Sequence, residues 1–246
     1  GFRAVSLEAY SAEEHARLLA AAERYGNAYI NAYNVTILLS DLVLWPTLPI
    51  ELFLRFYSQV KKYHTLSVVS SVRLHRVQAK MNLRYFLEST IHAAYTLAEP
   101  TTTAYFDLNG GKLADARKAT GLAHRWIKQA FPAHSSVIKE MKEEINRETA
   151  HANIVNSEHN FEFVPGERAE IHTTYFDFGD DGRQLKTDLW LAAKAGLHAA
   201  DLILATRRLA GGFVPKSGAG DLQTLMRDND EVLSELKSES PTASDG

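Results

Sequence analysis

Apolar and polar residues alternate with the period of an α-helix over most of the chain, and the first such stretch has a marked start. Ser11 followed three residues later by Glu14 is a capping-box pattern, which is typical of a helix N-terminus. The residues after it, mostly alanine, leucine, glutamate and arginine, favour a helix as far as about Arg24. Gly26 is then expected to break or bend this helix.

Tyrosines recur at every fourth position here, as Tyr25, Tyr29 and Tyr33. They lead into the longest apolar run of the chain, Val35 to Trp45, which Pro46 ends. Because four residues make about one helical turn, we expect the three rings to pack on a central helix or a second subunit, and not to stack on nucleic-acid bases. The apolar run is longer than one small core face needs. We therefore expect self-association, with a homodimer as its simplest form.

Four further helices are expected between Pro46 and residue 157. The longest, Leu66 to Ala98, contains neither glycine nor proline, and Glu99-Pro100 closes it. A loop follows, because the stretch from Thr101 to Gly111 is rich in threonine, asparagine and glycine. The other three helices are expected at 51–64, 112–129 and 135–157.

The pattern changes between residues 161 and 187. Ile171 to Phe178 is β-branched and aromatic, a turn of glycine and aspartate follows, and Arg183 to Lys186 can return as an antiparallel strand. Phe161 to Val164 is the candidate third strand. Asp188 is then the expected N-cap of a last long helix, which ends at Gly211-Gly212.

Together these elements predict a mainly α fold, with six to eight helices around one core and a small antiparallel hairpin or three-stranded sheet near 161–187. Residues 1–215 are expected to form a single helical domain, within which the N-terminal helices at 11–64 are a candidate subdomain. Residues 216–246 form an acidic C-terminal extension with seven acidic and three basic residues. We expect an amphipathic piece of it, 222–236, to dock and residues 238–246 to be disordered.

Composition narrows the class of protein. Of the 246 residues, 45% are hydrophobic and 23% are charged, which is typical of a soluble globular protein. The net charge of −3 does not favour nucleic-acid binding by the chain as a whole. The absence of cysteine excludes disulfides, thiolate catalysis and cysteine-ligated metal sites. The longest apolar run is too short to span a bilayer, and we expect a cytoplasmic protein without a membrane span.

The sequence lacks the motifs of several large enzyme classes, namely the phosphate-binding lysine loop, the dinucleotide fingerprint and the Gly-x-Ser-x-Gly elbow. Glu148 and His151 form one Glu-x-x-His pair, which di-iron helical bundles use twice. Glu88 and His92 are four residues apart, so the second pair is missing. We therefore expect neither a metal nor another cofactor, and we assign no catalytic residue.

Basic residues dominate the segment from Phe53 to Leu87, which contains seven of them and no acidic residue. Within it, a stripe formed by Arg73, Arg76 and Lys80 is spaced so that its side chains share one helical face with Arg84. Two interpretations are open. The stripe is either a solvated or acid-paired face, or a binding surface for RNA, a nucleotide or an acidic partner.

Two polar clusters are the candidate ligand-binding residues. In the first, Arg84, Glu88 and His92 follow one another at intervals of four residues, which predicts either a partly buried Arg84–Glu88 ion pair or the floor of a ligand pocket. The second contains His151 and Asn153, with Asn156 and His159 behind them. It provides either caps and side-chain hydrogen bonds or one wall of the same site.

These two segments carry a resemblance. The stretch YHTLSVVSSVRLHRVQAKMNLRYFLESTIHAAYTLAEP is similar to the Arg-x-x-x-Glu helix of a group of uncharacterised, mostly bacterial helical proteins, with Arg84 and Glu88 at the two positions of that motif. The later stretch FPAHSSVIKEMKEEINRETAHANIVNS resembles the same group, with His151 at its histidine. The resemblance covers residues 50 to 210. It implies an α-helical fold, distantly like that of HEPN proteins, and no activity.

Two hypotheses for the function remain. The first is a non-catalytic binding or regulatory module whose polar residues meet an anionic ligand, RNA or an acidic partner. The second is a metal-independent, HEPN-like RNase that uses a histidine together with an arginine. Only Arg117 and His124 have the spacing of the HEPN motif, and one match is no more than chance supplies. The missing catalytic motifs favour the first hypothesis.

Overall fold

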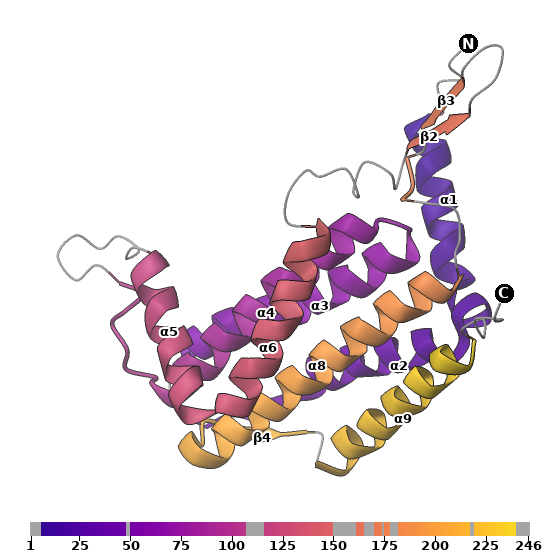
Figure 1. The fold of residues 1–246 in the computed structure, drawn as a ribbon. Helices are drawn as coiled ribbons and strands as arrows, with labels where there is room; N and C mark the ends of the chain where they lie inside the picture. The colour runs from indigo at the N-terminus through magenta and orange to yellow at the C-terminus, as the bar shows by residue number, and fades with distance from the viewer. Residues whose placement is uncertain are drawn as a thin grey trace, which may run out of the picture.

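The architecture is described by a computed structural model (Figure 1). It describes residues 6–47, 50–106, 116–149, 161–164, 170–173, 175–177, 182–216 and 219–239. Within them are eight helices and two small antiparallel sheets, so the expected mainly α fold is confirmed. The helices are α1 (Leu7–Leu19), α2 (Ala21–Asp41), α3 (Glu51–Val72), α4 (Arg76–Ala98), α5 (Ala116–Ala130), α6 (Pro132–Thr149), α8 (Gly182–Ala210) and α9 (Ala219–Ser238).

The fold is organised around α8. This helix packs against α2, α3 and α4, while α9 lies across α2 and α8 and the pair α5 and α6 covers α4 (Figure 1). Its buried side is made largely of alanine and leucine, which lets neighbouring helices approach closely. Among the described helices, α8 alone is long and apolar enough to cross a membrane, and 72% of its most apolar window is buried in the fold. That burial is typical of the core helix of a soluble protein.

The helices α2, α3 and α8 approach one another closely at His64. The imidazole is fully buried, with Nε2 at 3.1 Å from the Ala192 carbonyl oxygen and Nδ1 at 3.0 Å from the Thr36 hydroxyl. Because a carbonyl only accepts, Nε2 carries the proton and Nδ1 accepts from Thr36. A Cβ on Gly196 would lie 2.6 Å from Nε2 and 2.4 Å from Val35, so the ring fits only because residue 196 has no side chain.

The expected single helix over Leu66 to Ala98 is wrong. The chain instead turns back at residues 73–75, where Leu74 is buried with a left-handed φ of 60°, and α3 and α4 form a hairpin. A distant segment stabilises the turn. The Asp177 carboxylate accepts from the Val77 amide at 3.1 Å, which caps α4, and the Asp177 amide donates to the Leu74 carbonyl at 2.8 Å.

The first helix also begins earlier than expected. Ser6 is the N-cap, its hydroxyl accepting from the Ala9 amide, so the pattern of Ser11 and Glu14 lies inside α1. Glu14 instead reaches His75 in the turn between α3 and α4, at 2.9 Å. The bend expected at Gly26 is confirmed, because this residue has a φ of 50° within α2.

The small sheets differ from expectation in their partners. Strand β2 (Phe161–Val164) pairs with β3 (Glu170–Thr173), whereas Arg183 to Lys186 is not a strand but the start of α8. Asp188 is therefore inside the helix and not its cap. A second sheet, which the sequence analysis missed, pairs β1 (Val43–Pro46) with β4 (Phe213–Pro215). Its strands come directly after α2 and α8, so the sheet ties the ends of these two helices together.

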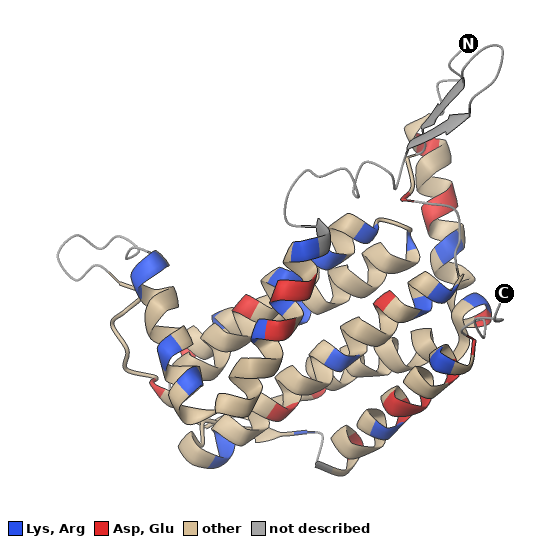
Figure 2. Cartoon of the chain, viewed as in Figure 1, with Lys and Arg blue, Asp and Glu red and all other residues tan. Residues whose placement is uncertain are grey.

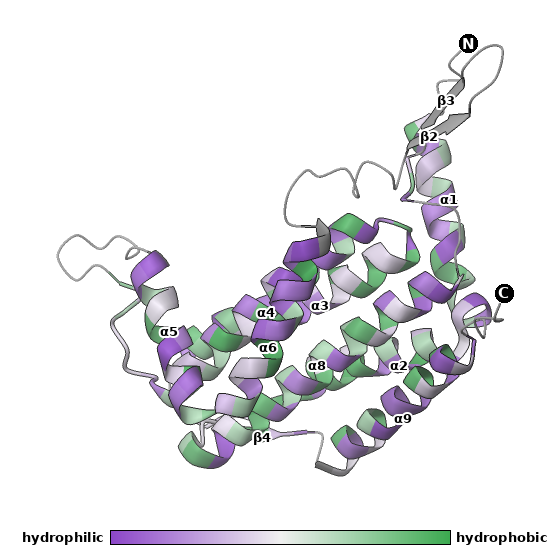
Figure 3. Cartoon of the chain, in the orientation of Figure 1, coloured by the Kyte–Doolittle hydropathy of each residue, from purple (hydrophilic) through white to green (hydrophobic). Residues whose placement is uncertain are grey.

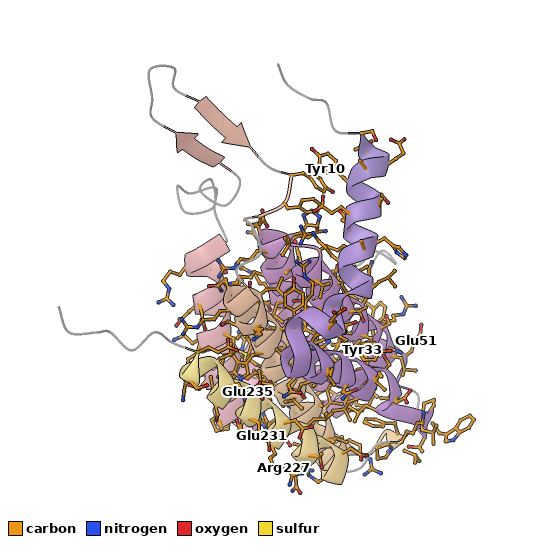
Figure 4. The ribbon with its side chains drawn as sticks, turned by 90° about the vertical axis from the view of Figure 1, so that its right-hand side faces the viewer. Tyr10, Tyr33, Glu51, Arg227, Glu231 and Glu235 are labelled. Atoms are coloured by element: carbon orange, nitrogen blue, oxygen red, sulfur yellow. The ribbon has the colours of Figure 1, made fainter. Side chains whose placement is uncertain are left out.

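The helix α9 and the outer side of α2 complete the body. Asn229 of α9 makes a buried hydrogen bond of 2.9 Å to Asn31 of α2, and polar and apolar residues alternate along α9 (Figure 3). On α2, Tyr25 is buried, whereas Tyr33 is half-exposed and lies on the same side of the molecule as Glu231 of α9 (Figure 4). Self-association through this side stays a prediction. Of the segment expected to be disordered, residues 240–246 lie outside the described residues.

Replacing Gly196 by alanine should destabilise the protein, because the new Cβ must displace either His64 or Val35. Overpacking of this kind costs about 1–3 kcal/mol, partly offset by the better helix propensity of alanine. Chemical denaturation measures the change. The control is Gly220→Ala in α9, where a Cβ would meet nothing within 4 Å and we expect no loss. Equal effects of the two substitutions would contradict the close approach at Gly196.

Acid should destabilise the protein through His64. Burial lowers the pKa of His64 to about 4, and its hydrogen bond to Ala192 only partly opposes this shift. The unfolded chain, with a pKa near 6.5, takes up a proton first. Stability is therefore complete above pH 6.5 and falls by about 3 kcal/mol as the pH decreases to about 4. Urea denaturation between about pH 7 and 4 measures this slope, which should be flatter in His64→Gln. Equal slopes in the wild type and in His64→Gln would show that His64 does not cause the loss of stability in acid.

Candidate anion-binding site

A group of polar side chains from three helices meets on the side of the molecule that α5 and α6 cover. The row Arg84, Glu88 and His92 runs along α4 and faces both of these helices. Across it stand His124 of α5 and Lys142 of α6. We call the residues around the carboxylate the Glu88 cluster, which consists of Arg84, Glu88, His124, Lys142 and Asn146.

The carboxylate of Glu88 is the centre of this cluster. One oxygen accepts from the Lys142 ammonium, and the other lies 3.0 Å from Nε2 of His124. The Glu88 side chain is 28% exposed, and those of His124 and Lys142 are 37% and 17% exposed. The cluster is thus open to solvent on the side of α5 and closed on the side of α6.

These partners determine the charge of Glu88. Burial by itself raises the pKa of Glu88, but the hydrogen bonds from His124 and Lys142 outweigh burial and bring the pKa down to about 2. The carboxylate is therefore ionised throughout the physiological range. It balances only one of the two permanent cations around it, Arg84 and Lys142, so the cluster keeps a positive charge.

The expected ion pair between Arg84 and Glu88 is wrong. Arg84 is half-buried and its Nη1 donates to the side-chain oxygen of Asn146, while Glu88 takes its partners from α5 and α6. A spacing of four residues on one helix permits the ion pair. It does not predict which side chains of neighbouring helices compete for the same partners. Two side chains of α6, Lys142 and Asn146, are the partners of Glu88 and Arg84 instead.

His92 belongs to a neighbouring aromatic group. Its Nδ1 lies 2.6 Å from the hydroxyl of Tyr105, and the ring of Phe56 stacks on it at 4.9 Å. Burial lowers the pKa of His92, against the opposing influence of Glu88. Since the imidazole is stacked and hydrogen-bonded on one edge, it forms the wall beside the Glu88 cluster and is not a member of it.

The basic stripe does not form one surface, because the chain turns back within it. Arg73 lies in the turn, 3.5 Å from Glu14 of α1. Arg76 and Lys80 both face Asp188 of α8, at 2.9 and 3.6 Å, and Lys80 is buried. Of the two interpretations left open by the sequence, the structure favours an acid-paired face. Asp188, expected as a helix cap, pairs with Arg76 and Lys80, whereas Glu14 pairs with Arg73.

The second polar cluster predicted from the sequence cannot be placed relative to the Glu88 cluster. His151 and Asn153, with Asn156 and His159, lie outside the described residues, so their place in the site stays a prediction. Among the described residues there is no group of three or more histidine, cysteine, aspartate or glutamate side chains that could hold a metal ion. The Glu88 cluster contains a single carboxylate, and both of its oxygens already have partners, Lys142 and His124.

The most prominent feature of the site was missed by the sequence analysis. All the charged residues of α5 are basic, whereas α6 mixes both signs (Figure 2). The signal was present in the sequence as cations at helical spacing without an acidic residue among them. The spacing of the HEPN motif involves only Arg117 and His124, and it does not include Lys118, Arg125 and Lys128. Comparisons with protein-family models, curated proteins and solved structures found no match to the chain.

Replacing Glu88 by glutamine should destabilise the protein by about 2 kcal/mol, because Lys142 would keep its charge in a poorly solvated position without a carboxylate. The matched control is Glu143→Gln on the same helix as Lys142. Glu143 pairs with Lys139 across side chains that are 64% and 75% exposed, so less than about 0.5 kcal/mol should be lost.

The same pair of variants tests the charge of Glu88. Its contribution is complete above the unfolded pKa, near 4.3, and is lost as the pH falls towards 2. The stability difference between the wild type and Glu88→Gln, measured by urea denaturation, should therefore hold at pH 5 and shrink below about pH 4. A difference that is unchanged at low pH would show that packing, and not charge, is responsible.

Proposed function

We propose that the protein is a non-catalytic binding module that takes an anionic ligand, with RNA as the chemical class, on the exposed face of α5 next to the Glu88 cluster. One observation carries the proposal. The described helix α5 bears four basic residues and no acidic one, and all four are on its solvent side. They are Arg117, Lys118, Arg125 and Lys128.

Helical geometry places these cations together. At about 100° per residue, the four basic residues and His124 fall within about 120° of one another on α5. We call this set the basic face. The opposite side carries Ala123 and Ile127, which are fully buried, with Trp126 packed against the same core. A helix with one apolar and one uniformly basic side presents its charge to solvent in a fixed orientation.

The neighbouring helices extend the positive charge of the basic face. His124 lies at the edge of the basic face and contacts Glu88. The Glu88 cluster, which has a net positive charge, therefore adjoins the basic face. A ligand with several phosphates in a row suits this arrangement, because each lysine or arginine that pairs with a phosphate releases a counterion. The net charge of −3 belongs to the whole chain and includes the acidic helix α9, so it does not describe this side of the molecule.

A metal-independent RNase is the second candidate, and a specific observation favours it. Nε2 of His124 lies 3.0 Å from the Glu88 carboxylate, which orients the ring, and the side chain is 37% exposed. An oriented and accessible imidazole can take the proton of a ribose hydroxyl that attacks the adjacent phosphorus. Binding stands first, because the carboxylate beside His124 also pairs with Lys142, and His92 is stacked on Phe56 and hydrogen-bonded to Tyr105.

Binding of a fluorescein-labelled single-stranded RNA, followed by anisotropy between roughly 50 and 200 mM salt, tests the proposal. We expect Arg125→Gln with Lys128→Gln to weaken binding at least tenfold and to lower the slope of log K against log salt by about 1.4. The matched control is Arg227→Gln with Lys237→Gln, which removes two exposed cations from α9. Equal losses in the two double variants, or no binding at the lowest salt, would contradict the proposal.

The same mixtures separate binding from catalysis. The RNA is analysed on a gel after incubation with and without a chelator, and the binding proposal expects intact RNA. Cleavage that survives the chelator and disappears in His124→Ala would establish the RNase instead, and His151→Ala tests the second predicted histidine. Binding of polyglutamate but not of RNA would contradict RNA as the ligand and indicate an acidic protein instead.

A further inference from the structure

A small pocket opens on the other side of α6, where this helix lies against α8. Its volume is about 260 Å³. This lies just below the range of about 300–1,000 Å³ that drug-sized ligands occupy, and it therefore suits a smaller molecule. The floor is apolar, with Met141 of α6 buried beneath it and Leu191 of α8 beside it. The pocket is independent of the Glu88 cluster, which uses the opposite face of α6.

The two walls of the pocket carry opposite charges. On α6, Glu140 and Glu144 are one helical turn apart. On α8, Trp190, Lys194 and His198 follow at the same spacing. Among the described residues, neither glutamate forms an ion pair with Lys194 or His198. The exposed carboxylates of Glu140 and Glu144 and the partly buried ammonium of Lys194 therefore line one pocket without forming an ion pair.

The basic wall also holds an unused hydrogen-bond donor. The indole Nε1–H of Trp190 is buried and has no acceptor among the described residues. Lys194 lies over the same indole, with its ammonium 5.1 Å from the ring centre, and so stays on this wall of the pocket. A buried donor without an acceptor is costly, and a ligand that accepts from it recovers that cost.

The far end of the pocket is fixed in position. His134 at the start of α6 lies 3.4 Å from Asp201 of α8, and its ring meets that of His198 edge to face at 6.4 Å. This contact joins the two helices beyond the pocket, which is already formed in the absence of a ligand. A preformed site of this kind loses little free energy to ordering when it binds.

We propose that this pocket binds a small zwitterion with an apolar side chain, that is, a free α-amino acid such as leucine or methionine. The ligand ammonium lies against Glu140 and Glu144, and the ligand carboxylate meets Lys194 and accepts from Trp190. The apolar side chain covers Met141. A ligand with only one of the two charges forgoes the attraction of the opposite wall and binds less tightly.

Titration of the full chain with leucine, followed by the indole N–H resonance of Trp190 in NMR and by calorimetry, tests the proposal. The chain has three tryptophans, and Trp190→Phe identifies the resonance. We expect this signal to move when leucine binds, and leucine methyl ester and N-acetylleucine to bind at least about tenfold more weakly. Binding of both analogues as tightly as leucine would overturn the proposal.

Substitutions in each wall of the pocket test its contribution to ligand binding. Lys194→Gln and Glu144→Gln should each weaken leucine binding at least about tenfold. Lys139→Gln and Glu143→Gln, which change an exposed pair outside the pocket on the same helix, should leave it unchanged. A loss confined to Lys194→Gln, with N-acetylleucine still binding, would make the ligand an anion. No shift of the Trp190 resonance with either amino acid would refute the site.

Discussion

The passage of α8 through the middle of the molecule depends on one steric constraint, the space that Gly196 leaves for His64. Because residue 196 has no Cβ, the buried imidazole reaches the backbone of α8 and donates to the Ala192 carbonyl. The same ring accepts from Thr36 of α2. A single side chain thus links three helices, and α4, which packs on α3 and α8, is covered in turn by α5 and α6.

Sequence patterns were sufficient where a structure depends on neighbouring residues. Helical spacing, prolines and the Gly211-Gly212 pair located most helices and their ends, and the bend at Gly26 followed from its lack of a side chain. Patterns failed where distant residues decide the outcome. Nothing between Leu66 and Ala98 breaks a helix locally, and the turn at Leu74 depends on Asp177, about 100 residues away. For the same reason Arg183 to Lys186 forms helix, although the residues before it predict a turn and a returning strand.

In the candidate site, too, the sequence predicted what depends on neighbouring residues and not what depends on distant ones. The row Arg84, Glu88 and His92 was recognisable on one helix, since its spacing is local. Its partners were not, because Lys142 and His124 come from two other helices whose approach no local pattern records. Charge patterning could have identified the basic side of α5, which depends on helical spacing alone. The pairing of Arg76 and Lys80 with Asp188, by contrast, requires the tertiary structure.

The central position of α8 also has a consequence for synthesis on the ribosome. Its residues are made about 160 positions after the start of α2, against which it packs. At about 5–20 residues per second, the start of α2 waits roughly 8–30 s, and the end of α4 roughly 4–17 s, before the helix that covers them begins to appear. During that interval their apolar sides face solvent or a chaperone. A nascent chain halted before residue 182 would lack its central helix, and it would be recognised by the quality-control machinery as unfolded protein.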